Sequence, residues 1–411
     1  MRGHPTEAAR PDPAATDPAA PDLTVPDLNP ALPIYRHSLL APQALALAGD
    51  GHALTYAELV QRAAGLAARL RQARTWPRAG APRPRVGVLA SRSIDACVAA
   101  LAAFWAGAVY VPLGNKAPAQ RLVQLLAQCE LSALVADAQG ASILGDAAAG
   151  RAVLAAGPPC VCVPDPAGLV LPAGSAVEVE LVSVDALSAM PAAAPVAPPV
   201  DPPAAMVAGD TAYIIFTSGT TGVPKGVVIP AGAMAAFLGA MAGVLGLGPQ
   251  DRVLGTFEST FDVSIQDMFC TWQAGASLHL LPATQVMNAA RMAREQRLTV
   301  WASVPSLVAL LRQVRAIEPG SLPDLRRSMF GGEPLPVGLA AAWRAAAPNS
   351  TVENHYGPTE ATVACLRQPV GAAPPLTPGR DCVALGRPLP GCDIAVLDEA
   401  GEQLPDGCRG E

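Results

Sequence analysis

One run of hydroxyl, glycine and lysine residues has the composition of an anion-binding loop. The stretch "AYIIFTSGTTGVPKG" (212–226) passes from an apolar run through threonine, serine and glycine to Lys225. A glycine-rich turn leaving a buried strand can direct several backbone N–H groups onto one phosphate, and hydroxyls and Lys225 add to them. Pro224 precedes the lysine and "VVI" continues as a strand, so this is not a Walker A loop, which opens a helix. The alternative is an ordinary turn joining two strands.

A second segment combines an aromatic ring, a fixed turn and a carboxylate. In "NHYGPTEATVA" (354–364), Tyr356 offers a flat face for a base, and the Gly357–Pro358 turn fixes the backbone after it. Glu360 supplies the oxygen ligand that a phosphate-bound magnesium ion prefers. The alternative is a helix start, with Thr359 as its cap and Glu360 in its first turn, and both interpretations can hold together.

A third segment places a carboxylate just before a predicted helix. In "FESTFDVSIQDMF" (257–269), Ser264 and Asp267 have capping-box-like spacing, which predicts a helix N-terminus. That leaves Asp262 unexplained. A carboxylate in an apolar setting suits a small ammonium group through a charge-assisted hydrogen bond. The competing interpretation is that Asp262 itself caps the helix.

The overall charge limits the partners that the chain can attract. Its 411 residues carry a net charge of -6, and the pI is near 5.5. This gives no general attraction to nucleic acid or to an anionic membrane, so we expect neither as a partner. We also find no Ser/His/Asp or Cys/His nucleophilic arrangement, which leaves positioning and electrostatic catalysis as the expected chemistry.

Cysteine usage and the absence of targeting signals favour a cytoplasmic protein. The nine cysteines form no paired C-x-x-C motifs with following histidines, which argues against a zinc site. The N-terminus lacks the apolar stretch of a signal peptide. The uncharged segment 96–113 nearly has the length of a membrane span, but Gly107 and Pro112 interrupt it. We therefore expect a buried helix running into a buried strand.

Strands and helices alternate along the chain. Residues 52–73 begin with Thr55 and Glu58 at capping-box spacing, and their apolar positions fall on one helical face. The strand "RVGVLA", a helix over 93–106 and the strand "VYVPL" follow. This alternation predicts an α/β fold of stacked, helix-covered sheets.

Changes in composition divide the chain into five expected parts. Proline and alanine dominate the N-terminus and a later linker. The parts are a disordered leader at 1–30, a first α/β subdomain at 31–190, a linker at 191–209, a second α/β subdomain with the nucleotide and substrate site at 210–375, and a β-rich segment at 376–411.

Four ordered motifs together resemble the adenylate-forming superfamily of acyl-CoA synthetases and amino-acid adenylation domains. They are "YIIFTSGTTGVPKG", "FDVSIQDMF", "GGEPLP" and "NHYGPTE". Weaker matches such as "LTYAEL" and "FWAGAVYVPL" extend the resemblance over nearly the whole chain. Within the family, Asp262 in "FDVS", "ASVPS" at 302–306, "YGPTEATVA" and Ala231 are similar to D-alanine–carrier-protein ligases.

The resemblance implies an AMP-forming ligase that uses ATP and Mg²⁺. In this family a carboxylate attacks the α-phosphorus of ATP and gives an acyl-AMP and pyrophosphate. A carrier-protein phosphopantetheine thiol then takes the acyl group. By position, the implied catalytic residues are Thr217, Lys225 and Glu360, and Glu360 would also bind Mg²⁺.

The resemblance also assigns binding roles. The β- and γ-phosphates would be held by Thr217, Ser218, Gly219, Thr220, Thr221, Gly222 and Lys225. The rest of the nucleotide site would comprise Asn354 and Tyr356 at the adenine, the Gly331, Gly332 and Glu333 backbone beside it, Thr359 at the α-phosphate, and His355, Gly357 and Pro358. Asp262 would bind the substrate's α-ammonium group, and its side-chain pocket would be lined by Val263, Gln266, Ser303, Met329, Gly331, His355, Val363 and Ala364.

One feature of the family does not appear in this chain. Its small C-terminal lid carries a ribose-binding aspartate and a catalytic lysine, and the chain ends at "GCRGE" before both. That lysine would stabilise the transition state electrostatically. We therefore expect full turnover to need the lid, and we expect this chain to be a fragment of a longer protein.

The sequence thus predicts activation of a small or polar amino acid as its adenylate, for loading onto a phosphopantetheinyl carrier protein in non-ribosomal-peptide-type biosynthesis. Gly331 leaves space in the pocket, Met329 and Gln266 limit its depth, and His355 and Gln266 can bond a polar side chain. Two alternatives stay open. One is an aryl- or acyl-CoA ligase, which needs no ammonium anchor, and the other is a lidless nucleotide-binding module without turnover.

Overall fold

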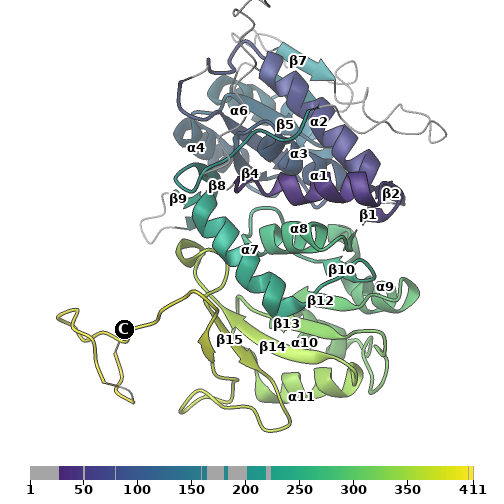
Figure 1. The fold of residues 1–411 in the computed structure, drawn as a ribbon, viewed down its shortest axis with the longest axis vertical. Coiled ribbons are helices and arrows are strands. Elements are labelled where there is room, and N and C mark those ends of the chain that lie inside the picture. The colour runs from purple at the N-terminus through teal and green to yellow at the C-terminus, as the bar shows by residue number, and fades with distance from the viewer. Residues whose placement is uncertain are drawn as a thin grey trace, which may run out of the picture.

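The protein is built on two β-sheets that lie one above the other, each with helices packed on it (Figure 1). The structure, a computed structural model, describes residues 27–49, 51–78, 80–158, 160–163, 180–183, 201–218, 224–405 and 407–410. The predicted α/β fold of stacked, helix-covered sheets is confirmed.

The upper sheet in Figure 1 has seven strands in the order β7-β6-β5-β3-β4-β8-β9. Its strands pair in parallel up to β8, and β9 is antiparallel to β8. The central strands are continuous apolar runs because helices cover both faces. The strands are β3 (Arg85–Ala90), β4 (Val109–Gly114), β5 (Ala133–Ala136), β6 (Cys160–Val163), β7 (Glu180–Ser183), β8 (Thr211–Ser218) and β9 (Pro224–Pro230). The helices in this part of the chain are α2 (Tyr56–Gln72), α3 (Ile94–Trp105), α4 (Ala119–Cys129), α5 (Ala138–Gly145) and α6 (Ala149–Ala156).

The lower sheet has nine strands in the order β16-β15-β14-β13-β12-β10-β11-β1-β2. The strands from β14 to β1 pair in parallel, and antiparallel strands flank them on both sides. The strands are β1 (Leu45–Gly49), β2 (His52–Thr55), β10 (Arg252–Gly255), β11 (Ser277–Leu280), β12 (Val300–Ser303), β13 (Arg327–Phe330), β14 (Thr351–Tyr356), β15 (Leu366–Pro369) and β16 (Arg387–Pro388). The remaining helices are α1 (Ala31–Leu40), α7 (Ala231–Leu245), α8 (Val263–Gln273), η2 (Ala283–Asn288), α9 (Ala289–Glu295), α10 (Pro305–Gln313), α11 (Val337–Ala346) and η3 (Thr359–Ala361).

The two sheets exchange strands between the halves of the chain. β1 and β2, from the N-terminal half, complete the lower sheet, whereas β8 and β9, from the second half, complete the upper one. The predicted division into 31–190 and 210–375 therefore does not coincide with the two sheets. This exchange brings the β8–β9 hairpin next to η3, which follows the lower sheet's β14.

Helix–helix packing fixes the two sheets against each other. The aromatic ring of Phe104 on α3 meets that of Phe269 on α8 edge to face, with centroids 5.1 Å apart. α3 is buried on all sides, so the apolar segment 96–113 is a core helix and strand, as predicted. None of the helices among the described residues is both long and apolar enough to cross a membrane.

Local capping begins several elements as the sequence indicates. Thr55 and Glu58 form the predicted capping box of α2, with the Glu58 N–H donating to Thr55 Oγ1 at 3.2 Å. Asp137 caps α5 through its Oδ1, and its Oδ2 accepts from Ser91 and Ser93 at 2.7–2.9 Å. The loop between β3 and α3 is therefore held at both of its serines.

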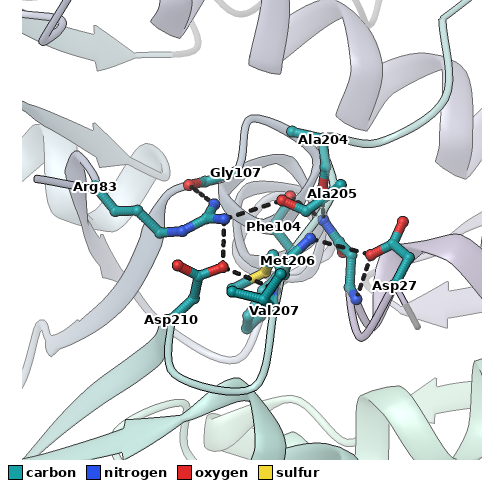
Figure 2. Close-up of polar contacts among 10 residues, drawn as sticks. Asp27, Arg83, Phe104, Gly107, Ala204, Ala205, Met206, Val207 and Asp210 are labelled. Carbon is teal, nitrogen blue, oxygen red and sulfur yellow. Dashed lines mark hydrogen bonds and ion pairs between the residues drawn. The ribbon is translucent and has the colours of Figure 1, made fainter. Parts of the chain in front are cut away.

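A polar cluster ties the segment before β8 to the upper sheet (Figure 2). Asn29 Nδ2 donates to the Phe104 and Ala204 carbonyls at 2.7 and 2.6 Å. Arg83 donates to the Gly107 carbonyl at 2.8 Å and pairs with Asp210. The end of the predicted linker is thus fixed where β8 begins, whereas residues 184–200 and 1–26 lie outside the described residues.

The C-terminal segment carries little regular structure. Beyond the two-residue β16, the described part of 376–410 holds isolated bridges, including Leu397 with Gln403 across a turn at Asp398. Figure 1 shows its yellow end reaching away from the sheets. Among its described residues, the segment that was predicted to be β-rich therefore holds only this one short strand and these bridges.

Candidate active site

A cavity of about 600 Å³ opens at the carboxyl ends of the parallel strands of the lower sheet. Ligands of open α/β sheets bind at this edge, because the loops that follow the strands converge there. The predicted pocket residues all line it: Asp262, Val263, Gln266, Ser303, Met329, Gly331, His355, Val363 and Ala364. Gly332, Glu333, Gly357, Pro358 and Thr359 from the predicted nucleotide site line it too. The structure thus brings together segments spread over a hundred residues, and their roles remain predictions.

Asp262 brings an incompletely paired carboxylate to this cavity. It is 8% exposed, and its Oδ2 has no hydrogen-bonding partner. Burial raises the pKa of Asp262, a hydrogen bond from the Thr359 hydroxyl opposes that rise, and the nearby charge of Glu360 adds to it. A buried carboxylate with a free oxygen is costly unless a cation or donor meets it. Asp262 therefore keeps one carboxylate oxygen available for a cation or a hydrogen-bond donor.

The predicted helix start is confirmed, because α8 begins at Val263, but neither of the predicted caps is present. Asp262 occupies the N-cap position of α8, but its side chain makes no capping hydrogen bond. Ser264 and Asp267 form no capping box, because Ser264 Oγ donates to the Ser259 carbonyl at 3.3 Å and Asp267 points into the interior. Neither carboxylate is needed to begin the helix.

His355 is held by a buried charge network. Its Nε2 lies 2.9 Å from Glu353 Oε2, and Arg367 Nη1 lies 3.1 Å from Glu353 Oε1. Burial opposes ionisation of Glu353, but the hydrogen bond and charge of His355 outweigh it, together with two arginines, and lower its pKa. Because Nε2 is directed at a carboxylate, Nδ1 is the ring nitrogen left to meet a ligand.

The other polar side chains of the pocket already have weak or internal partners. Gln266 Nε2 points at Met329 Sδ at 3.7 Å, and sulfur is a weak acceptor. Ser303 Oγ accepts from Trp301 Nε1 at 2.9 Å and donates to the Val304 carbonyl. Gln266 is therefore the polar side chain of the pocket that can exchange its present partner for a ligand at the smallest cost in free energy.

Backbone geometry shapes one wall of the cavity. A Cβ added at Gly331 would stand 2.9 Å from the His355 carbonyl oxygen. The space beside Gly331 is thus filled by neighbouring backbone, which corrects the expectation that this glycine leaves room for substrate. Thr362 and Val363 adopt φ of 62° and 71°, a strained region for β-branched residues that is tolerated mainly at functional sites.

The predicted phosphate loop is only partly described. Thr217 and Lys225 are cross-strand partners at the end of the β8–β9 hairpin, and the Lys225 side chain is exposed. Gly219, Thr220, Thr221 and Gly222 lie outside the described residues, as does the side chain of Ser218. β9 lies beside η3, so the lysine strand and the turn that carries Thr359 and Glu360 are neighbours.

The remaining predicted nucleotide residues lie around this turn. Asn354 is buried and donates to the Ala384 carbonyl at 3.1 Å, whereas Tyr356 is half exposed. Glu333 accepts from the Ser306 N–H and hydroxyl at 3.0 Å, which fixes the turn after β13. The alternative that Thr359 caps a helix is wrong, because Pro358 holds the N-cap position of η3 and makes no capping bond.

The described side chains at this site could bind magnesium only together with phosphate oxygens. Among the described residues, no three acidic, histidine or cysteine side chains converge on a point that could hold a metal. Mg²⁺ commonly takes one or two carboxylates and completes its shell with phosphate oxygens and waters. Glu360, exposed beside the hairpin, offers one such carboxylate.

The sequence did not single out a group of charged residues at the cavity. Lys116 and Arg92, from the loops after β4 and β3, both face Glu258, with N–O distances of 2.8 and 3.5 Å. All three line the cavity, together with Thr256 and Phe261. Each of them follows a buried strand, but these strands belong to two different sheets, so no local pattern in the sequence pointed to this group.

Comparison with known proteins shows what this chain is similar to. A family model described as "AMP-binding enzyme" matches residues 36–411. The L-proline--[L-prolyl-carrier protein] ligase of Streptomyces coelicolor is 33% identical over 366 residues, covering 87% of this chain and 64% of that protein. Pyochelin synthetase PchF of Pseudomonas aeruginosa is 31% identical over 380 residues, covering 91% of this chain and 18% of that protein. The Vibrio cholerae adenylation domain AlmE, solved with glycyl-adenosine-5'-phosphate, shares 26% identity and a TM-score of 0.74, covering 94% of this chain and 70% of that one. The chain spans less than two thirds of the length of these two curated relatives.

Proposed function

The chain belongs to the AMP-binding enzyme family, and on that premise we propose that it activates an amino acid with ATP. The products are an aminoacyl-AMP and pyrophosphate, and the aminoacyl group then passes to the phosphopantetheine thiol of a carrier protein. The single observation that carries this proposal is Asp262, whose buried carboxylate keeps one oxygen unpaired at the cavity beside Thr359.

The reaction follows from where the charges lie. Asp262 accepts hydrogen bonds from the substrate's α-ammonium group and so leaves the substrate's carboxylate free to react. That carboxylate oxygen forms a bond to the α-phosphorus of ATP, and the bond from this phosphorus to the bridging oxygen breaks, so that pyrophosphate leaves. No proton transfer is needed, because the nucleophile is already an anion. Catalysis then depends on orientation and on charge stabilisation.

The nucleotide is held across the β8–β9 hairpin and η3. Thr217 and Lys225 bind the β- and γ-phosphates together with the loop between them, and Thr359 binds the α-phosphate. Asn354 and Tyr356 hold the adenine beside the Gly331–Glu333 backbone. Glu360 would hold Mg²⁺, which neutralises phosphate charge when bound. The neighbouring positions of β9 and η3 support this arrangement.

We propose a small or polar amino acid as the substrate. Met329 and Gln266 close one side of the pocket through their mutual contact, which limits its depth. His355 is tied to Glu353, so the group most easily turned toward a polar side chain is Gln266. The relatives named for L-proline and for a glycyl adenylate support a small side chain. The relative named as a carrier-protein ligase supports the carrier protein as partner.

ATP–pyrophosphate exchange across a panel of carboxylic acids tests the proposal. The panel contains glycine, alanine, serine and proline, the aromatic amino acids, and matched acids that lack the amine. The assay is run with and without a C-terminal lid domain of this family supplied in trans. We expect a small or polar amino acid to exceed the aromatic ones by at least about tenfold.

The other outcomes separate the competing functions. Highest exchange with an acid that lacks the amine would point to an acyl-CoA ligase. Calorimetric ATP binding without exchange, even with the lid, would point to a nucleotide-binding module.

A further inference from the structure

A second, much smaller cavity lies between the two sheets, next to the substrate cavity. Its volume is about 30 Å³, and it shares Arg92 and Phe257 with the substrate cavity as lining residues. Asp267 of helix α8 and Tyr110 of β4, a strand of the upper sheet, both line it. It therefore lies where the upper sheet contacts the helix that follows Asp262.

Several buried polar atoms at this cavity lack partners. Asp267 is 5% exposed, and neither of its carboxylate oxygens makes a hydrogen bond of good geometry, although the Thr256 N–H lies near it. Arg92 Nε is also unpaired, and the Tyr110 hydroxyl makes no hydrogen bond of good geometry, although the Ser259 side chain lies near it. Burial raises the pKa of Asp267 well above its usual range, and the charge of Arg92 opposes that rise. Unpaired buried groups of this kind are costly. The walls of the cavity are mainly apolar, so these unpaired groups are what would hold a water there, and a space of this size holds about one.

Arg92 is fixed from behind. Its neighbours Ser91 and Ser93 both donate to Asp137 Oδ2, at 2.7 and 2.9 Å from their hydroxyls. Because the loop is held on both sides of Arg92 and the side chain itself is buried, its guanidinium has little freedom to move. Arg92 therefore holds a fixed position relative to the upper sheet.

From this position Arg92 faces both ends of one short segment, which runs from the loop after β10 into α8. Its Nη2 lies 3.5 Å from Glu258 Oε1, and across the small cavity it faces Asp267. The segment from 258 to 267 contains Asp262 and Gln266, and its turn is closed by the Phe261 N–H donating to the Glu258 carbonyl at 2.9 Å. Holding both ends of this segment fixes where Asp262 stands.

We propose that the small cavity binds one ordered water between Arg92 and Asp267, and that Arg92 is a positioning residue that sets the place of Asp262. This inference rests on the proposed function, in which Asp262 receives the substrate's ammonium group. Arg92 acts through Glu258 directly and through Asp267 by way of the water. The water donates to the Asp267 carboxylate and accepts from Arg92 Nε–H.

A high-resolution crystal structure tests the water independently of catalysis. We expect one ordered water within hydrogen-bonding distance of Asp267 and Arg92 in the unliganded protein. A dry cavity, or a direct Arg92–Asp267 ion pair that closes it, would overturn the water-binding site. This measurement stands whether or not the protein shows adenylation activity.

Kinetics of three variants test the positioning role. Arg92→Lys keeps the charge but offers one ammonium group, which cannot reach both Glu258 and Asp267. We expect it and Asp267→Ala to raise KM for the amino acid by about fivefold or more, with KM for ATP within about twofold. Asp267→Asn keeps one carbonyl oxygen for the water. We expect its KM for the amino acid to be close to that of the unsubstituted protein and well below that of Asp267→Ala.

Asp251→Ala is the matched control. Asp251 is also a buried carboxylate of the lower sheet, but it pairs with Arg326 away from the cavity. We expect this control to lower the melting temperature at least as much as Asp267→Ala and to leave both KM values unchanged. Equal KM effects in the control, or unchanged KM in Arg92→Lys and Asp267→Ala, would overturn the positioning role. Absence of exchange in the unsubstituted protein when the lid is supplied would instead overturn the proposed function.

Discussion

Glu353 joins His355 and Arg367 through its two carboxylate oxygens, at 2.9 and 3.1 Å, directly behind the substrate cavity. Because these groups are largely shielded from water, the network both stabilises the lower sheet and orients the His355 ring. It gives the first prediction.

Glu353→Gln is expected to destabilise the protein by about 1–3 kcal/mol at pH 7, because it leaves the buried His355 and the partly exposed Arg367 without their anion. The folded pKa of Glu353 lies below its ordinary value of 4.5. Its stabilisation is therefore complete above that value and is lost as pH falls through the lower folded pKa. Urea unfolding of both proteins from pH 7 down to pH 3 measures the difference, which should shrink over the acid end of that range.

An exposed glutamate provides the control for that measurement. Glu295 lies 3.8 Å from Arg291 in a surface pair on α9, and such pairs contribute little. We expect Glu295→Gln to change stability by less than about 0.5 kcal/mol at every pH. A Glu353→Gln difference that stays constant down to pH 3 would contradict the charge network.

Gly331→Ala is expected to impair the site through the backbone. The new Cβ would stand 2.9 Å from the His355 carbonyl oxygen, so β13 and β14 must separate at the cavity. We expect a loss of about 1–3 kcal/mol in stability and a raised KM for the amino acid. Thermal unfolding and pyrophosphate exchange measure the two effects.

Gly338→Ala is the matched control, in the helix that follows β13. Gly338 lies in α11, and nothing stands within 4 Å of an added Cβ there. Alanine favours helix, so we expect a gain of about 0.5–1 kcal/mol with unchanged exchange. Equal destabilisation by both substitutions would show that the close approach to His355 is unimportant.

Lys225→Ala is expected to weaken ATP binding. Lys225 pairs across the hairpin with Thr217 and is exposed, so its removal should not unfold the protein. Loss of one charge-assisted phosphate contact corresponds to about 1.5–3 kcal/mol, or at least about a tenfold rise in Kd. Calorimetry with ATP measures this. Arg312→Ala, on the far end of α10, is the control, and an equal loss of affinity in both would remove Lys225 from the site.

Much of the fold could be predicted from local signals. The spacing of Thr55 and Glu58 predicted the capping box of α2, and the continuous apolar run 96–113 predicted a buried helix and strand. The exchange of strands between the two sheets could not be predicted. It depends on pairings such as Leu47 with Leu278 and Tyr110 with Tyr213, which join residues distant along the chain. No local pattern specifies such partners.

The residues of the candidate site differ in the same respect, because some could be predicted from local motifs and others could not. Residues that lie in compact motifs, such as Asp262 and Thr359, could be singled out because each motif has a recognisable composition. Arg92 and Glu258 could not, since each is a single charged residue whose meaning arises only where two sheets meet. The unpaired oxygen of Asp262 is likewise a property of the packed structure. The sequence alone left open whether that carboxylate capped a helix.

The most direct test of the account is pyrophosphate exchange by Asp262→Ala and Asp262→Asn with the preferred amino acid and with its analogue that lacks the amine. Removing the carboxylate that meets a buried ammonium group should lower exchange with the amino acid by about 30-fold to several thousand-fold, corresponding to about 2–5 kcal/mol. ATP affinity and exchange with the amine-free analogue should stay within about twofold of the unsubstituted protein. If instead Asp262→Ala exchanges with the amino acid as well as the unsubstituted protein does, Asp262 is not the ammonium-binding group and the proposed activity is contradicted.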